Sequence, residues 1–391
     1  MLIAGFATGC AGDDNAEGGT GETSSETGAT GDGDGDPTGD GDGDPGTGDG
    51  DGDPTGDGDG DPTGDGDGDE PTGDGDGGQT TGDGDGDGGL PPEVWQDAQY
   101  AYQRSTHIYA EAQRHENWGG PVSEEIELLL ELWEPTDAPP GRPAMVMIHG
   151  GGFVGGTRND ANMVAFAEYF AERGWVTVSI DYRLVSDRGT VSEAWADTVE
   201  LLAPPQQINQ AYALYPAARD AKAAVRWLVA NADTYQIDTD YLTTVGGSAG
   251  SYLAITLGVT EPEDFRDEVD AMDDPTLATT NLGAGSEVHT IIDHWGGITH
   301  MEILEAIDGV SRFDATDAPV SIVHGTADAT VAFNEAEKLR DAYLDSGVEH
   351  AFHPLEGAGH GAWGQSVDGM NLRELAFAFV VQQQGLLVPL P

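Results

Sequence analysis

The sequence predicts an α/β fold: a mostly parallel central sheet with helices on both faces, preceded by a disordered acidic linker. From about residue 91 onward, short apolar runs alternate with segments of helical periodicity. The run at 144–148 is apolar throughout, as strands buried on both faces are. The part before these runs has a different composition, because the first 90 residues hold 26 of the 72 acidic side chains and none of the 15 Lys and Arg.

This change in composition divides the chain into residues 1–10, 11–90 and 91–391. The first segment ends at Cys10, the single cysteine, and resembles the end of a bacterial lipoprotein signal. A lipid anchor is therefore expected at Cys10; the alternative is an idle thiol. The last segment is long enough for a full hydrophobic core and is expected to be the catalytic domain. A net charge of −57 argues against nucleic acid and anionic membrane surfaces as partners.

Residues 11–90 contain a low-complexity array built on the unit PTGDGDGD. Glycine at every second position disfavours helix and strand, so this segment is predicted to be a solvated spacer. Alternating aspartates also occur in EF-hand calcium loops, but Pro37 stands where such a loop needs glycine. Loose attraction of counterions is therefore the expected behaviour, and specific calcium binding is the weaker alternative.

The elements of the third segment follow from their apolar patterns. The runs at 144–148 and 175–180 suit strands buried on both faces, and the segment at 164–173 has helical spacing and ends at Gly174, a natural C-cap. Strands are predicted at 125–132, 144–148, 175–180, 242–245, 288–292, 320–323 and 349–354. Helices are predicted at 164–173, 217–231, 249–257, 334–344 and 372–383. Long connections at 185–214 and 261–287 are expected to overhang the carboxyl edge of the sheet, where ligands bind in such folds.

The string Gly246-Gly247-Ser248-Ala249-Gly250 lies between a predicted strand and a predicted helix. This strand–turn–helix context is typical of a nucleophile elbow, in which glycines allow a tight turn that lifts the serine hydroxyl above the sheet. The alternative is a glycine-rich turn with a capping serine.

A second glycine-rich loop, His149-Gly150-Gly151-Gly152-Phe153, follows a buried strand. Its flexible backbone lets N–H groups converge on one point, as the oxyanion of an acyl-transfer intermediate requires. We expect the N–H groups of Gly151, Gly152 and Ala249 to form this oxyanion hole, and His149 to shape the loop. Phe153 is expected to contact the substrate.

Two further side chains follow predicted strands. Asp328 comes after the strand at 320–323 and can orient an imidazole, with Asp293 as its nearest competitor. His360 follows the last predicted strand between small residues and suits a general base. Its rival, His353, lies within that strand and is interpreted as a packed or edge histidine.

The order Ser248, Asp328, His360 is that of α/β hydrolases, and residues 125–383 resemble carboxylesterases of that family with the His-Gly-Gly-Gly motif, together with their feruloyl-esterase-like relatives. The other matching motifs are Asp181-Tyr182-Arg183-Leu184, Tyr215-Pro216-Ala217 and the run from Asp220 to Leu228. The resemblance implies a serine nucleophile that hydrolyses carboxylic esters, with Ser248, Asp328 and His360 as the catalytic triad, no cofactor and no metal.

Two other functions stay open at this point. One is a serine peptidase of the prolyl-oligopeptidase type, which shares the triad order, and the other is a non-catalytic binding module on an acidic stalk. For the esterase we expect a small-molecule or polysaccharide-linked ester as substrate. The spacer and Cys10 predict a location in the cell envelope or outside the cell, with membrane contact only through the lipid anchor.

Overall fold

The computed structural model describes residues 90–389. The expected lipoprotein segment with Cys10, and the acidic spacer up to residue 89, lie outside these residues. Within 90–389, no helix combines the length and the apolar character that crossing a bilayer requires.

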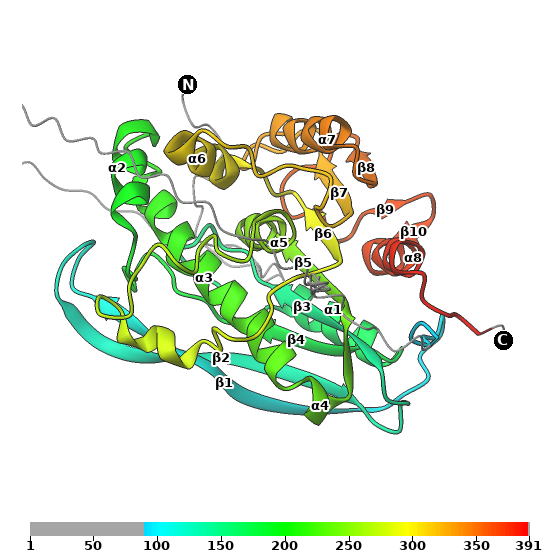
Figure 1. Ribbon diagram of the computed structural model, residues 1–391. Coiled ribbons are helices and arrows are strands. Elements are labelled where there is room, and N and C mark those ends of the chain that lie inside the picture. Colours follow the sequence, from blue (N-terminus) through cyan, green and yellow to red (C-terminus); the bar gives the residue numbers. More distant parts are fainter. Residues whose placement is uncertain (1–89, 390–391) are drawn as a thin grey trace, which may run out of the picture. The chain divides into compact units, whose positions relative to one another are not determined.

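An eight-stranded sheet runs through the described chain in the order β1-β2-β4-β3-β5-β6-β7-β8 (Figure 1). Its strands are β1 (Tyr102–His115), β2 (Val122–Pro135), β3 (Arg142–Ile148), β4 (Val176–Ile180), β5 (Ile237–Gly247), β6 (Thr290–His294), β7 (Val320–Gly325) and β8 (His350–Leu355). The strands β3 to β8 are parallel, whereas β1 and β2 form an antiparallel hairpin and β2 is antiparallel to β4. The predicted mostly parallel sheet is confirmed.

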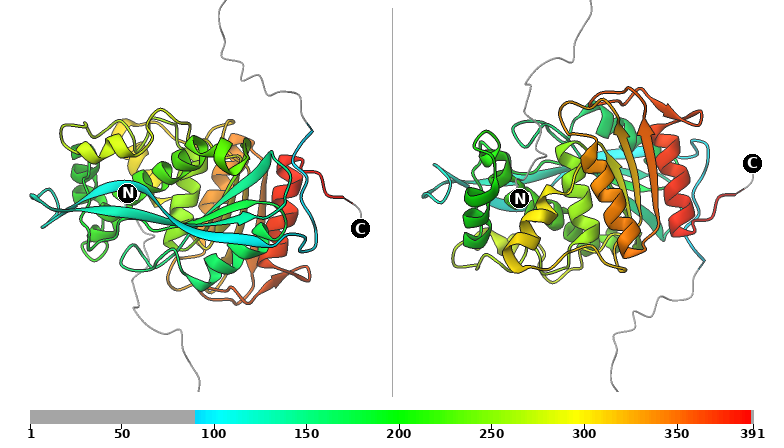
Figure 2. Two further views of the ribbon diagram at one scale, coloured as in Figure 1. Left: turned by 90° about the horizontal axis from the view of Figure 1, so that it is seen from below. Right: turned by 90° about the horizontal axis from the view of Figure 1, so that it is seen from above.

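Helices cover both faces of this sheet (Figure 2). On one face lie α1 (Ala161–Ala171) and α8 (Leu372–Gln384), and on the other lie α3 (Ile208–Ala230), α5 (Ala249–Val259), α6 (Thr299–Asp308) and α7 (Asn334–Ser346). Strand β3 shows how the sequence builds two cores. Met145 and Met147 pack with the α1 and α8 cluster, and Val146 and Ile148 pack with the opposite cluster. An uninterrupted apolar run is thus buried on both faces.

The remaining elements are short. They are α2 (Glu193–Leu202), α4 (Ala232–Tyr235), the 3-10 helix η1 (Pro275–Thr279) and the two-stranded sheet of β9 (Ser366–Val367) and β10 (Met370–Asn371). The long connection at 185–214 contains α2 and the first turns of α3. The connection at 261–287 contains η1 and packs on the hairpin strand β1, where the N–H of Glu111 donates to Oγ1 of Thr279 at 2.8 Å.

Several elements differ from the sequence predictions. No prediction was made for the strands β1, β9 and β10 or for the helices α2, α4, α6 and η1. Helix α3 begins at Ile208 instead of 217, and β6 covers Thr290–His294 instead of 288–292. The early start of α3 places Pro216 inside a helix, where its ring removes one backbone hydrogen bond. Tyr212, Ala213 and Leu214 are buried in the core just before this proline, and their packing holds the helix through it.

Candidate active site

Ser248 lies at the sharp turn between β5 and α5. Its backbone angles are φ 55° and ψ −122°, a region that residues other than glycine rarely occupy. Two glycines permit the turn, because a Cβ on Gly250 would lie 2.0 Å from the carbonyl oxygen of Ile148, and one on Gly246 would lie 2.2 Å from that of Gly250. The turn holds the Ser248 hydroxyl beside the N-terminus of α5, where the helix dipole favours negative charge.

His360 approaches Ser248 from the loop after β8. Its Nε2 atom lies 2.9 Å from Oγ of Ser248, and its Nδ1 atom lies 2.8 Å from Oδ2 of Asp328. An ionised carboxylate can only accept, so the Nδ1–H group donates to Asp328 and the serine hydroxyl donates to Nε2. In this tautomer the imidazole can take the proton of Ser248.

Asp328 is held by the loop that follows β7. Its Oδ1 atom accepts the backbone N–H groups of Thr330 at 2.8 Å and Val331 at 3.0 Å, which leaves Oδ2 to His360. Burial alone would raise the pKa of Asp328, but hydrogen bonds from His324, from His360 and from the Thr330 N–H outweigh burial and hold that pKa well below its usual range. The carboxylate is therefore ionised at neutral pH.

The two rival residues have other surroundings. Asp293 lies in β6, where its Oδ1 atom accepts the N–H of Gly296 at 2.9 Å and burial raises its pKa to about 6. His353 lies within β8, and burial lowers its pKa. It is Asp328 and His360 that the fold brings to Ser248.

The glycine-rich loop after β3 lies directly against the elbow. Gly151 and Gly152 have φ of 115° and 60°, which glycine adopts without strain. A Cβ on Gly150 would lie 2.7 Å from the carbonyl oxygen of Gly247 and 3.3 Å from Cβ of Ser248. The backbone of this loop is therefore close enough to Ser248 for its N–H groups to act there, together with the N–H of Ala249 at the start of α5.

The side chains that flank these glycines are buried. The imidazole of His149 stacks on the ring of Tyr182 at 4.3 Å, and the Tyr182 hydroxyl donates to the His149 carbonyl oxygen at 2.8 Å. Burial lowers the pKa of His149, so it stays neutral and shapes the loop. Phe153 is 1% exposed and makes edge contacts with Tyr182 and Tyr252. Its ring therefore packs into the core, where burial of a large apolar surface stabilises the fold, instead of presenting an open surface for the substrate contact expected from the sequence.

Three residues of the site were not found by sequence reasoning. Gln210, near the start of α3, donates from Nε2 to the carbonyl oxygen of Gly152 at 2.9 Å and so supports the glycine-rich loop. Trp363 packs on Trp295 at 4.6 Å, and a Cβ on Gly247 would lie 2.6 Å from the Trp363 ring. These two indoles form an aromatic wall beside the elbow. The position of Trp363, three residues after His360, is a signal that could have indicated it, whereas nothing in the local pattern singles out Gln210.

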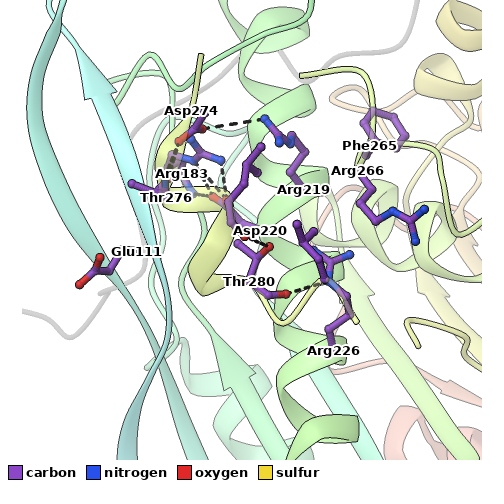
Figure 3. Close-up of a pocket in the computed structure, with 12 residues that line it drawn as sticks. Glu111, Arg183, Arg219, Asp220, Arg226, Phe265, Arg266, Asp274, Thr276 and Thr280 are labelled. Carbon is purple, nitrogen blue, oxygen red and sulfur yellow. Dashed lines mark hydrogen bonds and ion pairs between the residues drawn. The ribbon is translucent and has the colours of Figure 1, made fainter. Parts of the chain in front are cut away.

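A second group of charged side chains lies away from Ser248, between α3 and the connection at 261–287. A small cavity of about 10 Å³ is lined there by four arginines and three acidic residues, among other side chains. Figure 3 shows Arg183 against Asp220 and Arg219 facing Asp274. Both residues of the Arg183–Asp220 pair, 2.7 Å apart, belong to motifs noted in the sequence. The pair ties the segment after β4 to α3, which is a structural task.

No three histidine, cysteine or acidic side chains in the described part of the chain are grouped so that they could hold a metal ion. At the elbow, the structure brings together the hydroxyl of Ser248, the imidazole of His360 and the carboxylate of Asp328.

Parts of the chain are similar to known proteins. The chain is similar to the BD-FAE family, whose model matches residues 130–200 and 207–308. These segments contain the glycine-rich loop and Ser248 and end before Asp328 and His360. Esterase LipC of Mycobacterium tuberculosis is 26% identical over 260 residues, which are 60% of this chain and 56% of LipC. Esterase LipQ of the same organism is 25% identical over 57% of this chain and 51% of LipQ. The chain spans about half the length of these two relatives.

Solved structures show the same architecture. An esterase from Thermogutta terrifontis with bound propionate is 25% identical, with a TM-score of 0.51 over 73% of this chain and 96% of that one. The Thermogutta terrifontis esterase 2 phosphorylated by paraoxon is 26% identical, with a TM-score of 0.51 over 71% of this chain and 94% of that one. Together with the strand order, these neighbours show that the chain has an α/β hydrolase fold and is related to esterases of that type.

Proposed function

We propose that this α/β hydrolase is a serine esterase, a carboxylic ester hydrolase in which Ser248 is the nucleophile, His360 the general base and Asp328 the residue that orients His360. The observation that carries this proposal is the pair of hydrogen bonds from Oγ to Nε2 at 2.9 Å and from Nδ1 to Oδ2 at 2.8 Å. The relatives that are themselves esterases support it. So does the neighbour phosphorylated by paraoxon, since such reagents modify activated serine nucleophiles.

The reaction follows from these contacts. Ser248 Oγ attacks the ester carbonyl carbon while His360 Nε2 takes the hydroxyl proton, and Asp328 stabilises the imidazolium that forms. His360 then gives this proton to the leaving alcohol, which leaves an acyl group on Ser248. Water attacks the acyl carbon while His360 takes its proton, and His360 returns that proton to Ser248 Oγ as the acid leaves.

The negative charge of the tetrahedral intermediate needs donors that are already oriented. The N–H groups of Gly151, Gly152 and Ala249 are the donors in this proposal, because the glycine-rich loop lies against the elbow and Ala249 opens α5. Hydrogen bonding from Gln210 to Gly152 limits the motion of this loop. Such preorganised donors stabilise the transition state without reorganising during the reaction.

The substrate in this proposal is a small-molecule or polysaccharide-linked ester. The half-buried indole of Trp363, which packs on the buried Trp295 beside the elbow, suits an apolar acyl or alcohol group. For the whole protein, the acidic spacer and Cys10 support a location in the cell envelope or outside the cell, with the lipid on Cys10 as its anchor.

The proposal is tested with the Ser248→Ala variant of the full chain. The parent should hydrolyse p-nitrophenyl acetate and should gain the mass of one fluorophosphonate adduct. The variant should lose roughly 10⁴-fold or more in kcat and take up no probe, because the nucleophile is absent. Ser311→Ala, at an exposed serine remote from the elbow, is the matched control and should behave like the parent. Equal rates for Ser248→Ala and the parent would contradict the assignment.

A further inference from the structure

Asp328 is in contact with two imidazoles, and the proposed mechanism uses only one of them. His360 Nδ1 lies 2.8 Å from Oδ2 of Asp328, and His324 Nε2 lies 3.4 Å from the same oxygen. His324 Nε2 also lies 2.9 Å from the carbonyl oxygen of Val331, to which it donates. This second histidine therefore touches both the carboxylate and the loop that holds it.

His324 is completely buried, and its other ring nitrogen is unsatisfied. Nδ1 has no hydrogen-bond partner among the described residues, and neither has Oδ2 of Asp293. Asp293 pairs in register with Ile322 on the neighbouring strand, so His324, two residues further along β7, lies on the same face of the sheet as Asp293. His324 thus contacts the buried carboxylate of Asp328, and the buried carboxylate of Asp293 lies near enough on the same face of the sheet for its charge to act on the imidazole.

An uncharged ring also packs against His324. The ring of Phe333 makes an edge contact at 5.9 Å from the start of α7. Beyond Asp328 comes His360 from the loop after β8. Burial lowers the pKa of His324, but its contacts with Asp328 and Val331 and the charge of Asp293 outweigh burial, and the net shift is upward.

Resting on the proposed esterase function, we propose that His324 is a positioning residue that is protonated in the resting enzyme and sets the acid limb of its pH profile. A positive charge beside Asp328 offsets part of the carboxylate charge that acts on His360. Protonated His360 is then less favoured, and the base stays free to accept the Ser248 proton at lower pH. Asp293 is the buried counterion that keeps the proton on His324.

Two variants test this through the pH dependence of kcat/KM for p-nitrophenyl acetate. His324→Gln removes the charge and keeps an N–H donor for the Val331 carbonyl oxygen. Asp293→Asn removes the counterion and keeps an oxygen that can accept the Gly296 N–H. In both, the uncompensated charge of Asp328 favours protonated His360, so the acid limb should move to higher pH by roughly one unit. His353→Gln, in β8 outside this cluster, is the matched control and should leave the limb in place.

A purely structural role for His324 would lower kcat without moving the limb, and an unmoved limb in both variants would overturn the proposal. If His324→Gln fails to fold, Asp293→Asn and a direct measurement decide. In ¹⁵N-histidine NMR of the full chain at pH 6.5, the His324 signal should show two protonated ring nitrogens. This signal is identified because it is absent from the His324→Gln spectrum and changes in the Asp293→Asn spectrum. A neutral tautomer would refute it. This spectrum needs no turnover, so it separates failure of the inference from failure of the esterase proposal.

Discussion

At the scale of single residues, Gln210 links the connection at 185–214 to the glycine-rich loop beside Ser248. Its side chain is buried, and the bond that it donates to the Gly152 carbonyl oxygen fixes the peptide next to a proposed oxyanion donor. Gln210→Met keeps a similar volume and loses this bond. We expect kcat/KM for p-nitrophenyl acetate to fall roughly ten-fold, less than loss of a whole oxyanion donor costs, because the N–H groups remain and only their orientation loosens.

The fall should appear mainly in kcat, since the oxyanion forms only in the transition state. Gln206→Met serves as the matched control, because Gln206 is exposed in the same segment. The support role would be refuted by a Gln210→Met enzyme with parental kcat. It would also be refuted by a rise confined to KM, which would indicate that Gln210 contacts the substrate itself.

The residues of the site differ in how far the sequence could predict them. Ser248, Asp328 and His360 each follow a strand and stand near glycine or other small residues, so their own neighbourhoods indicated them. Asp328 was preferred to Asp293 from the sequence, although both aspartates lie at the carboxyl end of a strand, and the structure places Asp328 at 2.8 Å from His360. His324 and Gln210 act through contacts with residues distant along the chain or across a buried surface, and no local pattern contains that information.

At the scale of elements, the connection at 261–287 is held down by side chains of α3. Nζ of Lys222 donates to the carbonyl oxygens of Glu261 and Asp264, and Nε of Arg226 donates to that of Thr280 at 2.8 Å. The charges are costly to bury, and burial lowers the pKa of Lys222 to about 8 and that of Arg226 to about 10. The hydrogen bonds to carbonyl oxygens of the connection offset this cost.

Lys222→Met should therefore release the start of this connection. Two carbonyl oxygens lose their donor, and we expect a loss of stability on the order of 1–3 kcal/mol together with faster amide hydrogen exchange in residues 261–287. Urea unfolding and exchange measured by mass spectrometry would show both effects. Arg340→Met removes an exposed ion pair with Asp341 elsewhere and should change neither. Unchanged exchange in 261–287 would mean that Lys222 does not anchor the connection.

Elements were predictable where one physical signal dominated. Strands β3 and β4 are buried at every position and mostly apolar, and burial on both faces leaves little choice of structure. Strand β1 was not predicted because much of it is exposed and its sequence YQRSTHIYAEAQRH is largely polar. It forms a strand because it pairs with β2 over its whole length. The start of α3 was placed too late because Pro216 is locally unfavourable in a helix. The residues of the helical turn before it are buried, and their packing outweighs the cost of the proline.

At the scale of the whole molecule, the core encloses several ionisable groups that are neutral when buried. His294 and His300 are completely or almost completely buried, and burial lowers their pKa values to about 4 and about 3. Both ring nitrogens of His300 lack a hydrogen-bond partner within the described residues. The unfolded chain binds protons at these histidines below about pH 6.5, and the folded chain does not. Folding stability contributed by these groups is therefore lost as the pH falls from 6.5 toward 4.

The His300→Leu variant isolates this effect, because it removes one buried imidazole and leaves the other titrating groups in place. Between pH 7.5 and pH 5, the parent should lose on the order of 2 kcal/mol more stability than the variant, as measured by urea unfolding at each pH. Asp293 opposes the trend in both proteins, since burial raises its pKa to about 6 and the folded state gains that proton first; its contribution cancels in the comparison. His350→Leu, at a half-buried histidine of β8, should lose stability in parallel with the parent. Parallel curves of stability against pH for His300→Leu and the parent would contradict this prediction. They would show that His300 accepts a proton in the folded protein, because water or local opening reaches the ring where it packs on Tyr252.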